Sequence, residues 1–211
     1  MKRIFGLLMS MVIVFGLLLT LSGTAAAVPI LQTDSGWKVT PNDPGGSSWY
    51  TNAGFDDSSW QNATVLYDVG AVLGDPAFNG TKGIWSADGQ FSTTETQVWI
   101  RETFSLAGPL SFASLIVGCD DDCTVWVNGT QVINDTNGFA NNNTVANLSP
   151  YLNVGTNLIA YTVTDNFPVW GYNHSTWLQL DGATAVPEPA TLLLLGSGLA
   201  GLVALRKKFI A

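Results

Sequence analysis

The chain has 211 residues, and its 8 Lys and Arg face 16 Asp and Glu, which gives a formal net charge of −8. Between residues 28 and 185, fifteen acidic side chains face only Lys38, Lys82 and Arg101, a net charge of −12. Such a balance repels nucleic acid and anionic lipid surfaces, so nucleic acid is excluded as a partner. The high aromatic and β-branched content also argues against disorder.

Residues 1–27 have the pattern of a secretory signal peptide. Lys2 and Arg3 precede an apolar run over residues 4–21, and Ala25 and Ala27 supply the small residues of a signal peptidase site. A permanent membrane helix is the alternative, because the run is long for a signal. We expect signal peptidase to release the chain near Val28 into a compartment where disulfides persist.

Residues 28–182 are predicted to form a single all-β domain. Their number suits one domain with a substantial core. Short alternating or β-branched runs lie between Gly, Asn, Asp and Pro, and no run keeps helical periodicity over three turns. Residues 41–96 are expected to be mostly loop, with short apolar runs at 64–67 and 84–85. The clearer predicted strands are 98–106, 113–119, 123–127, 131–133, 158–164 and 177–180.

Two of these strands carry specific expectations. In 98–106, alternate residues share an apolar face that Glu102 interrupts, so an edge position is plausible for this strand. Strands 113–119 and 123–127 are expected to form a hairpin, with Asp120, Asp121 and Asp122 as its turn. A second turn follows at Asn128-Gly129, since both residues tolerate positive φ.

Cys119 and Cys123 flank the three aspartates. A disulfide across the predicted hairpin is the favoured state, and free thiols or metal ligation are the alternatives. The aspartates themselves suggest calcium, because hard oxygen ligands suit that ion. A solvated acidic turn is the more favoured reading, and the spacing does not fit an EF-hand loop.

A sugar site would need an exposed aromatic face for the pyranose ring and amides or carboxylates for its hydroxyls. All eight tryptophans lie between residues 28 and 185. Core packing explains the aromatics about equally well, because a sandwich of this size buries several of them. The candidates, chosen for their loop positions beside Asn and Asp, are Trp49, Tyr50, Trp85, Trp170, Tyr172 and His174.

We expect no enzymatic activity. His174 is the only histidine, and the sequence shows no partner that would orient it toward Ser175. Glycosidase chemistry would need two carboxyl groups about 5 to 9.5 Å apart, and nothing but acidity marks candidates for that pair. Those candidates are Asp56, Asp57, Glu95, Glu102 and Asp120 to Asp122.

The C-terminal end has three parts. A linker over residues 183–189 holds Val186, Pro187, Glu188 and Pro189, an apolar segment follows over residues 190–205, and residues 206–211 begin with Arg206, Lys207 and Lys208. Sixteen helical residues span roughly 24 Å, so the predicted transmembrane helix is a marginal durable anchor. The basic residues hold the tail in the cytoplasm, so the chain before Pro187 must lie outside.

These three parts resemble the PEP-CTERM sorting signal. The resemblance implies an exosortase-type membrane protease that cleaves near Pro-Glu-Pro after a transient inner-membrane stage. It also implies delivery to the cell surface or the exopolysaccharide matrix of a Gram-negative bacterium. By analogy with lipid-anchor signals, the mature protein would then carry no membrane helix. An ordinary C-terminal anchor is the alternative.

The middle of the chain resembles galactose-binding-domain-like jelly rolls, which include non-catalytic N-terminal domains of β-galactosidase-type glycosidases. Residues 125–129 and 148–160 carry the resemblance, with weaker support from 55–60 and 99–104. It implies a single jelly-roll β-sandwich and a non-catalytic domain, and it supports this fold more strongly than any ligand. Together with the sorting signal, it leads to the hypothesis that the domain binds extracellular polysaccharide. The alternative function is a structural or adhesive matrix protein without a specific small ligand.

Overall fold

The computed structural model describes residues 27–87, 96–166, 174–184 and 198. Residues 27–184 form one compact unit. The apolar segments predicted at 4–21 and 190–205, together with the sorting motif, lie outside the described residues except for residue 198. Within the described ranges, no helix is long and apolar enough to cross a membrane.

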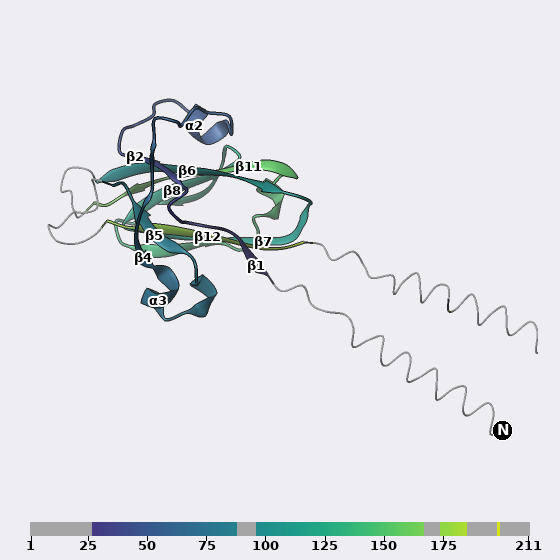
Figure 1. Ribbon diagram of the computed structural model, residues 1–211. Helices are drawn as coiled ribbons and strands as arrows, with labels where there is room; N and C mark the ends of the chain where they lie inside the picture. The colour runs from purple at the N-terminus through teal and green to yellow at the C-terminus, as the bar shows by residue number, and fades with distance from the viewer. Residues whose placement is uncertain (1–26, 88–95, 167–173, 185–197, 199–211) are drawn as a thin grey trace, which may run out of the picture. The chain divides into compact units, whose positions relative to one another are not determined.

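The domain is an all-β sandwich of two six-stranded sheets, which confirms the predicted fold class at that level (Figure 1). The first sheet has the order β10-β7-β12-β5-β4, with β1 also paired to β12, and the second has the order β3-β2-β6-β11-β8-β9. The first sheet contains β1 (Val28–Gln32), β4 (Thr64–Asp68), β5 (Lys82–Trp85), β7 (Leu110–Cys119), β10 (Asn141–Val145) and β12 (Thr176–Thr184). The second contains β2 (Lys38–Thr40), β3 (Gln61–Asn62), β6 (Gln97–Leu106), β8 (Asp122–Val127), β9 (Thr130–Asp135) and β11 (Gly155–Thr164).

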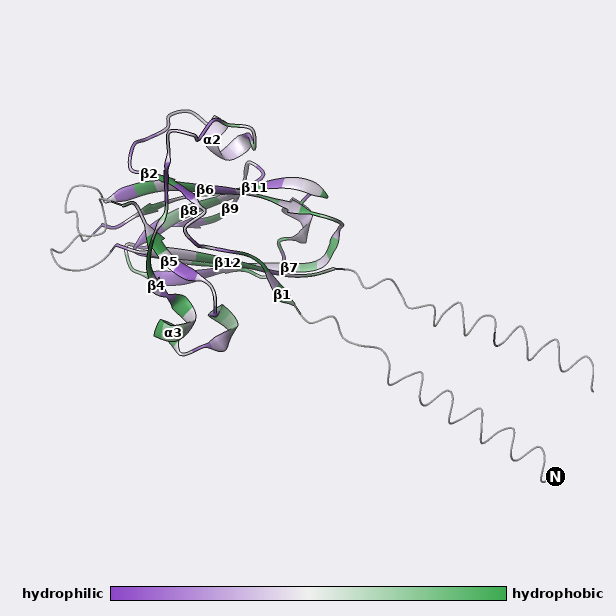
Figure 2. Ribbon diagram, viewed as in Figure 1, coloured by the Kyte–Doolittle hydropathy of each residue, from purple (hydrophilic) through white to green (hydrophobic). Residues whose placement is uncertain are grey.

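The core lies between the two sheets, where alternate residues of the long strands meet. β6 and β11 pair over ten residues, so that Ile100 lies opposite Tyr161, and both are fully buried. β7 and β12 pair over nearly their whole length, and Leu115 and Leu180 are buried opposite each other. Apolar segments run along the strands of both sheets (Figure 2). The period of two in the sequence therefore marks the inner faces correctly.

The predicted hairpin at residues 113–127 is wrong. β7 pairs with β10 and β12 in the first sheet, whereas β8 pairs with β9 and β11 in the second. The chain therefore crosses from one sheet to the other at Asp120 and Asp121. Alternation of apolar residues says which face of a strand is buried, but not which strand lies beside it, so it could not distinguish a crossing from a hairpin.

The crossing brings the two cysteines together. Cys119 ends β7 and Cys123 lies in β8, their Cα atoms are 6.0 Å apart, and their sulfur atoms form a disulfide. Both residues are only 3% exposed. The bond thus links the two sheets through the interior, instead of closing a hairpin within one sheet.

The Asn-Gly turn is present as predicted. Asn128 and Gly129 have φ values of 50° and 82°, and they connect β8 to β9. The Asn128 amide also donates to the carbonyl oxygen of Tyr151 at 2.7 Å and to Oδ1 of Asn157 at 2.8 Å. Tyr151 lies in the short helix η2 (Ser149–Tyr151), so the turn also holds the entry to β11.

Residues 41–60 are not only loop. They include the short helix α2 (Ser48–Thr51) and cover the outer face of the second sheet (Figure 1). A second hydrophobic cluster fills this space: buried Trp49, Trp60, Leu158 and Ala160, with Tyr50, Phe55, Trp99 and Trp126 packed against them. Much of the aromatic content is thereby used for packing.

Arg101 holds this cover in place. Its side chain is 1% exposed, pairs with Asp57, and donates to the carbonyl oxygens of Phe55 at 3.2 Å and Asn52 at 3.1 Å. A buried guanidinium is stable only when it is paired and hydrogen-bonded. Arg101 therefore fixes residues 52–57 to the second sheet.

The expected edge position of β6 is also wrong. β6 pairs with β11 along its whole length and with β2 at Trp99 to Arg101. Glu102 is half-buried within this inner strand, and burial raises its pKa to about 7, with the Asp34 and Asp57 charges adding to the shift. Glu102 therefore interrupts the apolar pattern as a carboxyl group whose charged form is disfavoured by burial, and not because the strand lies at an edge.

We expect Glu102→Gln to stabilise the domain at pH 8 by about 1 kcal/mol, after allowance for solvent screening. Because the folded-state pKa is raised, the folded protein binds more protons than the unfolded chain between pH 4.5 and 7, and stability falls as the pH rises through that interval. Urea unfolding at pH 4 and pH 8 measures this effect. The gain should disappear at pH 4, and Asp56→Asn, whose carboxyl has a lowered pKa, is the control that should not gain at pH 8.

Candidate functional site

The predicted sugar-stacking residues that the structure describes are largely buried. Trp49 is 3% exposed within the second hydrophobic cluster, and Trp85 is fully buried. Tyr50 is half-buried and stacks on Trp126 with ring centroids 4.6 Å apart. Contrary to the expectation, neither tryptophan presents an open ring face to a ligand. Trp170 and Tyr172 lie outside the described residues.

His174 has the partner that the sequence did not reveal. Its Nδ1 lies 2.5 Å from Oδ2 of Asp165, its ring stacks on Trp85 with centroids 5.2 Å apart, and it is 2% exposed. Asp165 directly follows β11, and His174 lies two residues before the start of β12. Their pairing depends on where two strands in different sheets end, and no local signal in the sequence indicates it.

Two of the three aspartates are committed to hydrogen bonds within the domain. Asp121 Oδ2 accepts from the backbone N–H of Asn166 at 2.9 Å, and Asp122 accepts from the Gly138 N–H at 2.7 Å and from the Asn166 amide at 2.7 Å. In the part of the chain that the structure describes, no three His, Cys, Asp or Glu side chains form a group that could hold a metal ion. The carboxylates of Asp121 and Asp122 instead bind loops.

An open cleft of about 280 Å³ lies at the end of the first sheet where the chain crosses to the second. Four of the five strands in the order of that sheet, together with the crossing turn, contribute to it. Its lining residues are Tyr67, Gly118, Cys119, Asp120, Ala140, Asn141, Asn142, Ser175 and Trp177. Of these, the sequence singled out Asp120 as a calcium candidate and Cys119 as a cysteine for which metal ligation was an alternative to a disulfide.

The floor of the cleft is one row of residues across the sheet. Asn142 in β10 pairs with Gly118 in β7, which pairs with Trp177 in β12, and Tyr67 in β4 pairs with Gly83 in β5. Cross-strand partners share a face of the sheet, so these side chains project on the outer side, opposite the core residue Leu178.

Glycine makes room for the two aromatic rings of this row. A Cβ on Gly118 would collide with the indole of Trp177, and a Cβ on Gly83 would collide with the phenol ring of Tyr67. Each ring therefore lies over a neighbouring strand. Phe78 packs edge-on against Trp177 at 5.0 Å, and the Tyr67 hydroxyl donates to Ser175 Oγ at 3.0 Å. Glycine inside a strand is the sequence signal for such a close approach, and Gly83 and Gly118 both carry it.

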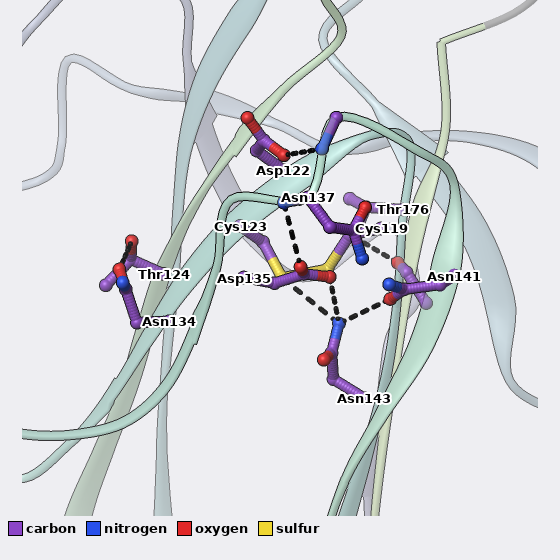
Figure 3. Close-up of a disulfide and its surroundings, with 12 residues drawn as sticks. Cys119, Asp122, Cys123, Thr124, Asn134, Asp135, Asn137, Asn141, Asn143 and Thr176 are labelled. Atoms are coloured by element: carbon purple, nitrogen blue, oxygen red, sulfur yellow. Dashed lines mark hydrogen bonds between the residues drawn. A yellow bond between two sulfur atoms is a disulfide. The ribbon is translucent and has the colours of Figure 1, made fainter.

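Amides form one side of the cleft. Asn143 donates to Oδ1 of Asn141 at 2.7 Å and to Oδ2 of Asp135 at 2.8 Å, beside the disulfide (Figure 3). This network fixes Asn141, while Asn142 is exposed on the edge strand β10. Within the described ranges, the Asn142 amide has no hydrogen-bond partner. Of the three consecutive asparagines, Asn141 and Asn143 are therefore held in a hydrogen-bond network, and Asn142 is open to solvent.

Asp120 supplies the charge of the cleft. It is half-buried, and burial raises the pKa of its carboxyl to about 6, with the Asp165 and Asp121 charges adding and His174 opposing. The cleft therefore combines amides, hydroxyls and one carboxylate above two packed aromatic rings.

The C-terminal segment gives the clearest comparison with known proteins. Residues 185–208 match the PEP-CTERM protein-sorting motif, as the Pro-Glu-Pro, apolar and basic parts predicted. The match covers the end of the chain and not the sandwich. The motif marks the protein as an exosortase substrate that is exported and sorted to the surface. No curated protein matches the chain.

The sandwich is similar in fold to parts of much longer glycosidases. A β-glycosidase from Bacteroides vulgatus has 20% identity and a TM-score of 0.47, covering 75% of this chain and 20% of its own. A β-glucuronidase from Bacteroides uniformis has 18% identity and a TM-score of 0.46, covering 74% and 18%. The chain spans about a fifth of the length of these proteins, and at such values their activities do not transfer to it.

We expect Gly118→Ala to destabilise the domain by about 1–3 kcal/mol, because the added methyl group must displace the Trp177 indole from its place on the sheet. Urea unfolding measures this loss. Gly108→Ala is the matched control, because a methyl group there meets nothing within 4 Å. Equal stability of the two variants would show that the floor of the cleft is not tightly packed.

Proposed function

We propose that the protein is a non-catalytic component of the bacterial cell surface or exopolysaccharide matrix, and that it binds carbohydrate in the cleft of the first sheet. The single observation that carries the binding step is the cleft itself, with its amides, hydroxyls and carboxylate on the outer face of a rigid sandwich. Function commonly lies where loops meet at one end of such a scaffold.

The proposed localisation rests on the sorting motif. Signal peptidase removes residues 1–27, and the C-terminal segment holds the chain in the inner membrane until an exosortase-type protease cleaves near Pro187. The host is then a Gram-negative bacterium, and the mature protein carries no membrane helix. The domain charge of −12 is consistent with a soluble component of a hydrated matrix.

The strand pairs support a jelly roll as the finer description of the fold. β5 pairs with β12, β6 with β11, β7 with β10 and β8 with β9. Four nested antiparallel pairs distributed alternately over two sheets are what a jelly roll requires. We therefore assign the sandwich to the jelly-roll type that the galactose-binding resemblance implied.

The chemistry of the cleft suits a sugar. Its volume of about 280 Å³ lies near the lower end of ligand pockets, roughly 300 Å³, which is appropriate to a single ring of a chain that continues into solvent. Asn142, Asn141 and Ser175 offer both donors and acceptors at close range. Hydroxyl-rich ligands need such pairs, since each unpaired polar group in the site lowers affinity.

The absence of catalysis is part of the proposal. His174 is enclosed by Asp165 and Trp85 and is 2% exposed, which supports a packing role. Asp121 and Asp122 accept hydrogen bonds from loop groups, which supports a structural role for them as well. A structural or adhesive role without a specific ligand is the outcome that a negative binding experiment would favour.

The mature protein should have its termini near Val28 and near Pro187 and should contain the Cys119–Cys123 disulfide. Intact-mass spectrometry of the protein released by a host that carries an exosortase measures all three features at once. The matched control is the same chain with Pro187, Glu188 and Pro189 replaced by alanine, which should keep its C-terminal segment. Retention of that segment in the unaltered chain would contradict sorting by cleavage.

Asn142→Ala should weaken carbohydrate binding about fivefold, because one hydrogen bond of about 1 kcal/mol is lost. The measurement is a glycan array followed by isothermal titration with the strongest ligand found. Gln131→Ala is the control, since this exposed amide lies on β9 in the other sheet and should leave affinity unchanged. Failure of every glycan to bind would overturn the ligand part of the proposal.

A further inference from the structure

Among the described residues that line the cleft, one carries a carboxyl group and none is cationic. Among its nine lining residues, Asp120 is the only Asp or Glu, and Lys, Arg and His are all missing. The domain as a whole has only Lys38, Lys82 and Arg101 to offset fifteen acids. Arg101 and Lys82 are each committed to an ion pair, with Asp57 and Asp68.

Asp120 differs from its neighbours because the fold leaves its carboxylate without a partner. Asp121 and Asp122 both accept hydrogen bonds from backbone or amide N–H groups. Among the residues that the structure describes, none donates a hydrogen bond to Asp120 or forms an ion pair with it. A half-buried carboxylate in this state has lost part of its hydration and gained no protein donor in exchange.

The charged groups around Asp120 make a nearby cation more favourable. Asp121 on the same turn and Asp165 at the end of β11 both repel its negative charge, and His174 before β12 is its one favourable neighbour. Tyr67 lines the cleft from β4. His174 is itself held against Asp165, so the region keeps an excess of negative charge.

We propose that the cleft selects sugars that carry a protonated amine, such as the hexosamine units of a partly deacetylated polysaccharide, and that Asp120 is the residue that determines this selectivity. The inference rests on the proposed carbohydrate-binding function. An ammonium group donates up to three hydrogen bonds and carries the charge that Asp120 lacks nearby. Asn142 and Ser175 are then available to the hydroxyl groups of the same ring.

The same geometry disfavours two other sugar classes. An N-acetylated amine is neutral and bulkier, so it gains only an ordinary hydrogen bond at Asp120. A uronic acid places a second carboxylate beside Asp120, Asp121 and Asp165, where like charges repel without a cation to separate them. The order of affinity should therefore be free amine, then N-acetylated sugar, then uronate.

Binding of the amine should have an optimum in pH. It strengthens as the pH rises through about 6, where Asp120 ionises, and it weakens again when the sugar amine loses its proton near pH 8, as α-amino groups do. The N-acetylated ligand should not weaken near pH 8, because it carries no amine that titrates. Its change near pH 6 should be smaller than that of the amine, because it has no charge to pair with ionised Asp120.

The test is isothermal titration of the mature protein, with its termini near Val28 and near Pro187, with tetramers of glucosamine, N-acetylglucosamine and galacturonate at pH 5, 7 and 8.5. We expect about a tenfold preference for the amine tetramer over the N-acetylated one at pH 7, which corresponds to about 1.4 kcal/mol. Asp120→Asn should remove this preference and leave affinity for the N-acetylated tetramer within about twofold. Asp120→Glu, which keeps the charge, should retain part of it.

Two controls separate the site from the general acidity of the domain. Asp43→Asn removes one negative charge from an exposed loop and should leave the preference unchanged. Asp120→Asn should unfold at a urea midpoint no lower than that of the wild type, because burial raises the pKa of the carboxyl that it replaces. Repeating the titration with EDTA excludes a bridging divalent cation, and a preference that EDTA removes would overturn the inference.

The outcomes distinguish the two proposals. If no tetramer and no arrayed glycan binds, the carbohydrate-binding function fails. If the N-acetylated and amine tetramers bind equally, or Asp120→Asn keeps the preference, the function survives and the selectivity proposal is overturned. A preference that Asp43→Asn lowers as much as Asp120→Asn does would likewise overturn it, because the attraction would then be a property of the whole surface.

Discussion

The passage of the chain from one sheet to the other at Asp120 and Asp121 is the constraint on which the cleft depends. It places Cys119 and Cys123 on opposite inner faces, where their disulfide joins the sheets. The same passage commits Asp121 and Asp122 to hydrogen bonds with Asn166 and Gly138. Asp120 is left to face the cleft. One short turn therefore joins the two sheets, anchors two loops and positions Asp120 in the cleft.

The second constraint is the flatness of the outer face beside that turn. Gly118 and Gly83 carry no side chain, so Trp177 and Tyr67 can lie across neighbouring strands. The outer face of the second sheet is covered instead of open. Residues 41–60 lie over it, and Arg101 fixes them there. The asymmetry explains why the aromatic residues of the covered face are packing residues and why the open hollow lies on the first sheet.

The negative charge of the domain bears on both the localisation of the protein and its proposed activity. A domain with a net charge of −12 is soluble outside the cell and repels anionic polymers. Within that field the cleft concentrates negative charge further, since Asp121 and Asp165 both act on Asp120. For the proposed carbohydrate ligand, the electrostatics therefore favour a cationic or neutral polymer over an anionic one.

The sequence by itself determined the C-terminal sorting motif, the all-β class, most long strands and the Asn128-Gly129 turn, because composition, period and turn chemistry are local properties. It also placed Cys119 and Cys123 in reach of each other through their short separation. Only the tertiary structure decided that strands 110–119 and 122–127 belong to different sheets, that Trp49, Trp85 and His174 are buried, and that Asn142, Gly118 and Trp177 form one row. Those facts depend on which strands are neighbours. Which strands pair depends on packing and register between segments far apart in the sequence, and alternation along a single strand does not indicate it.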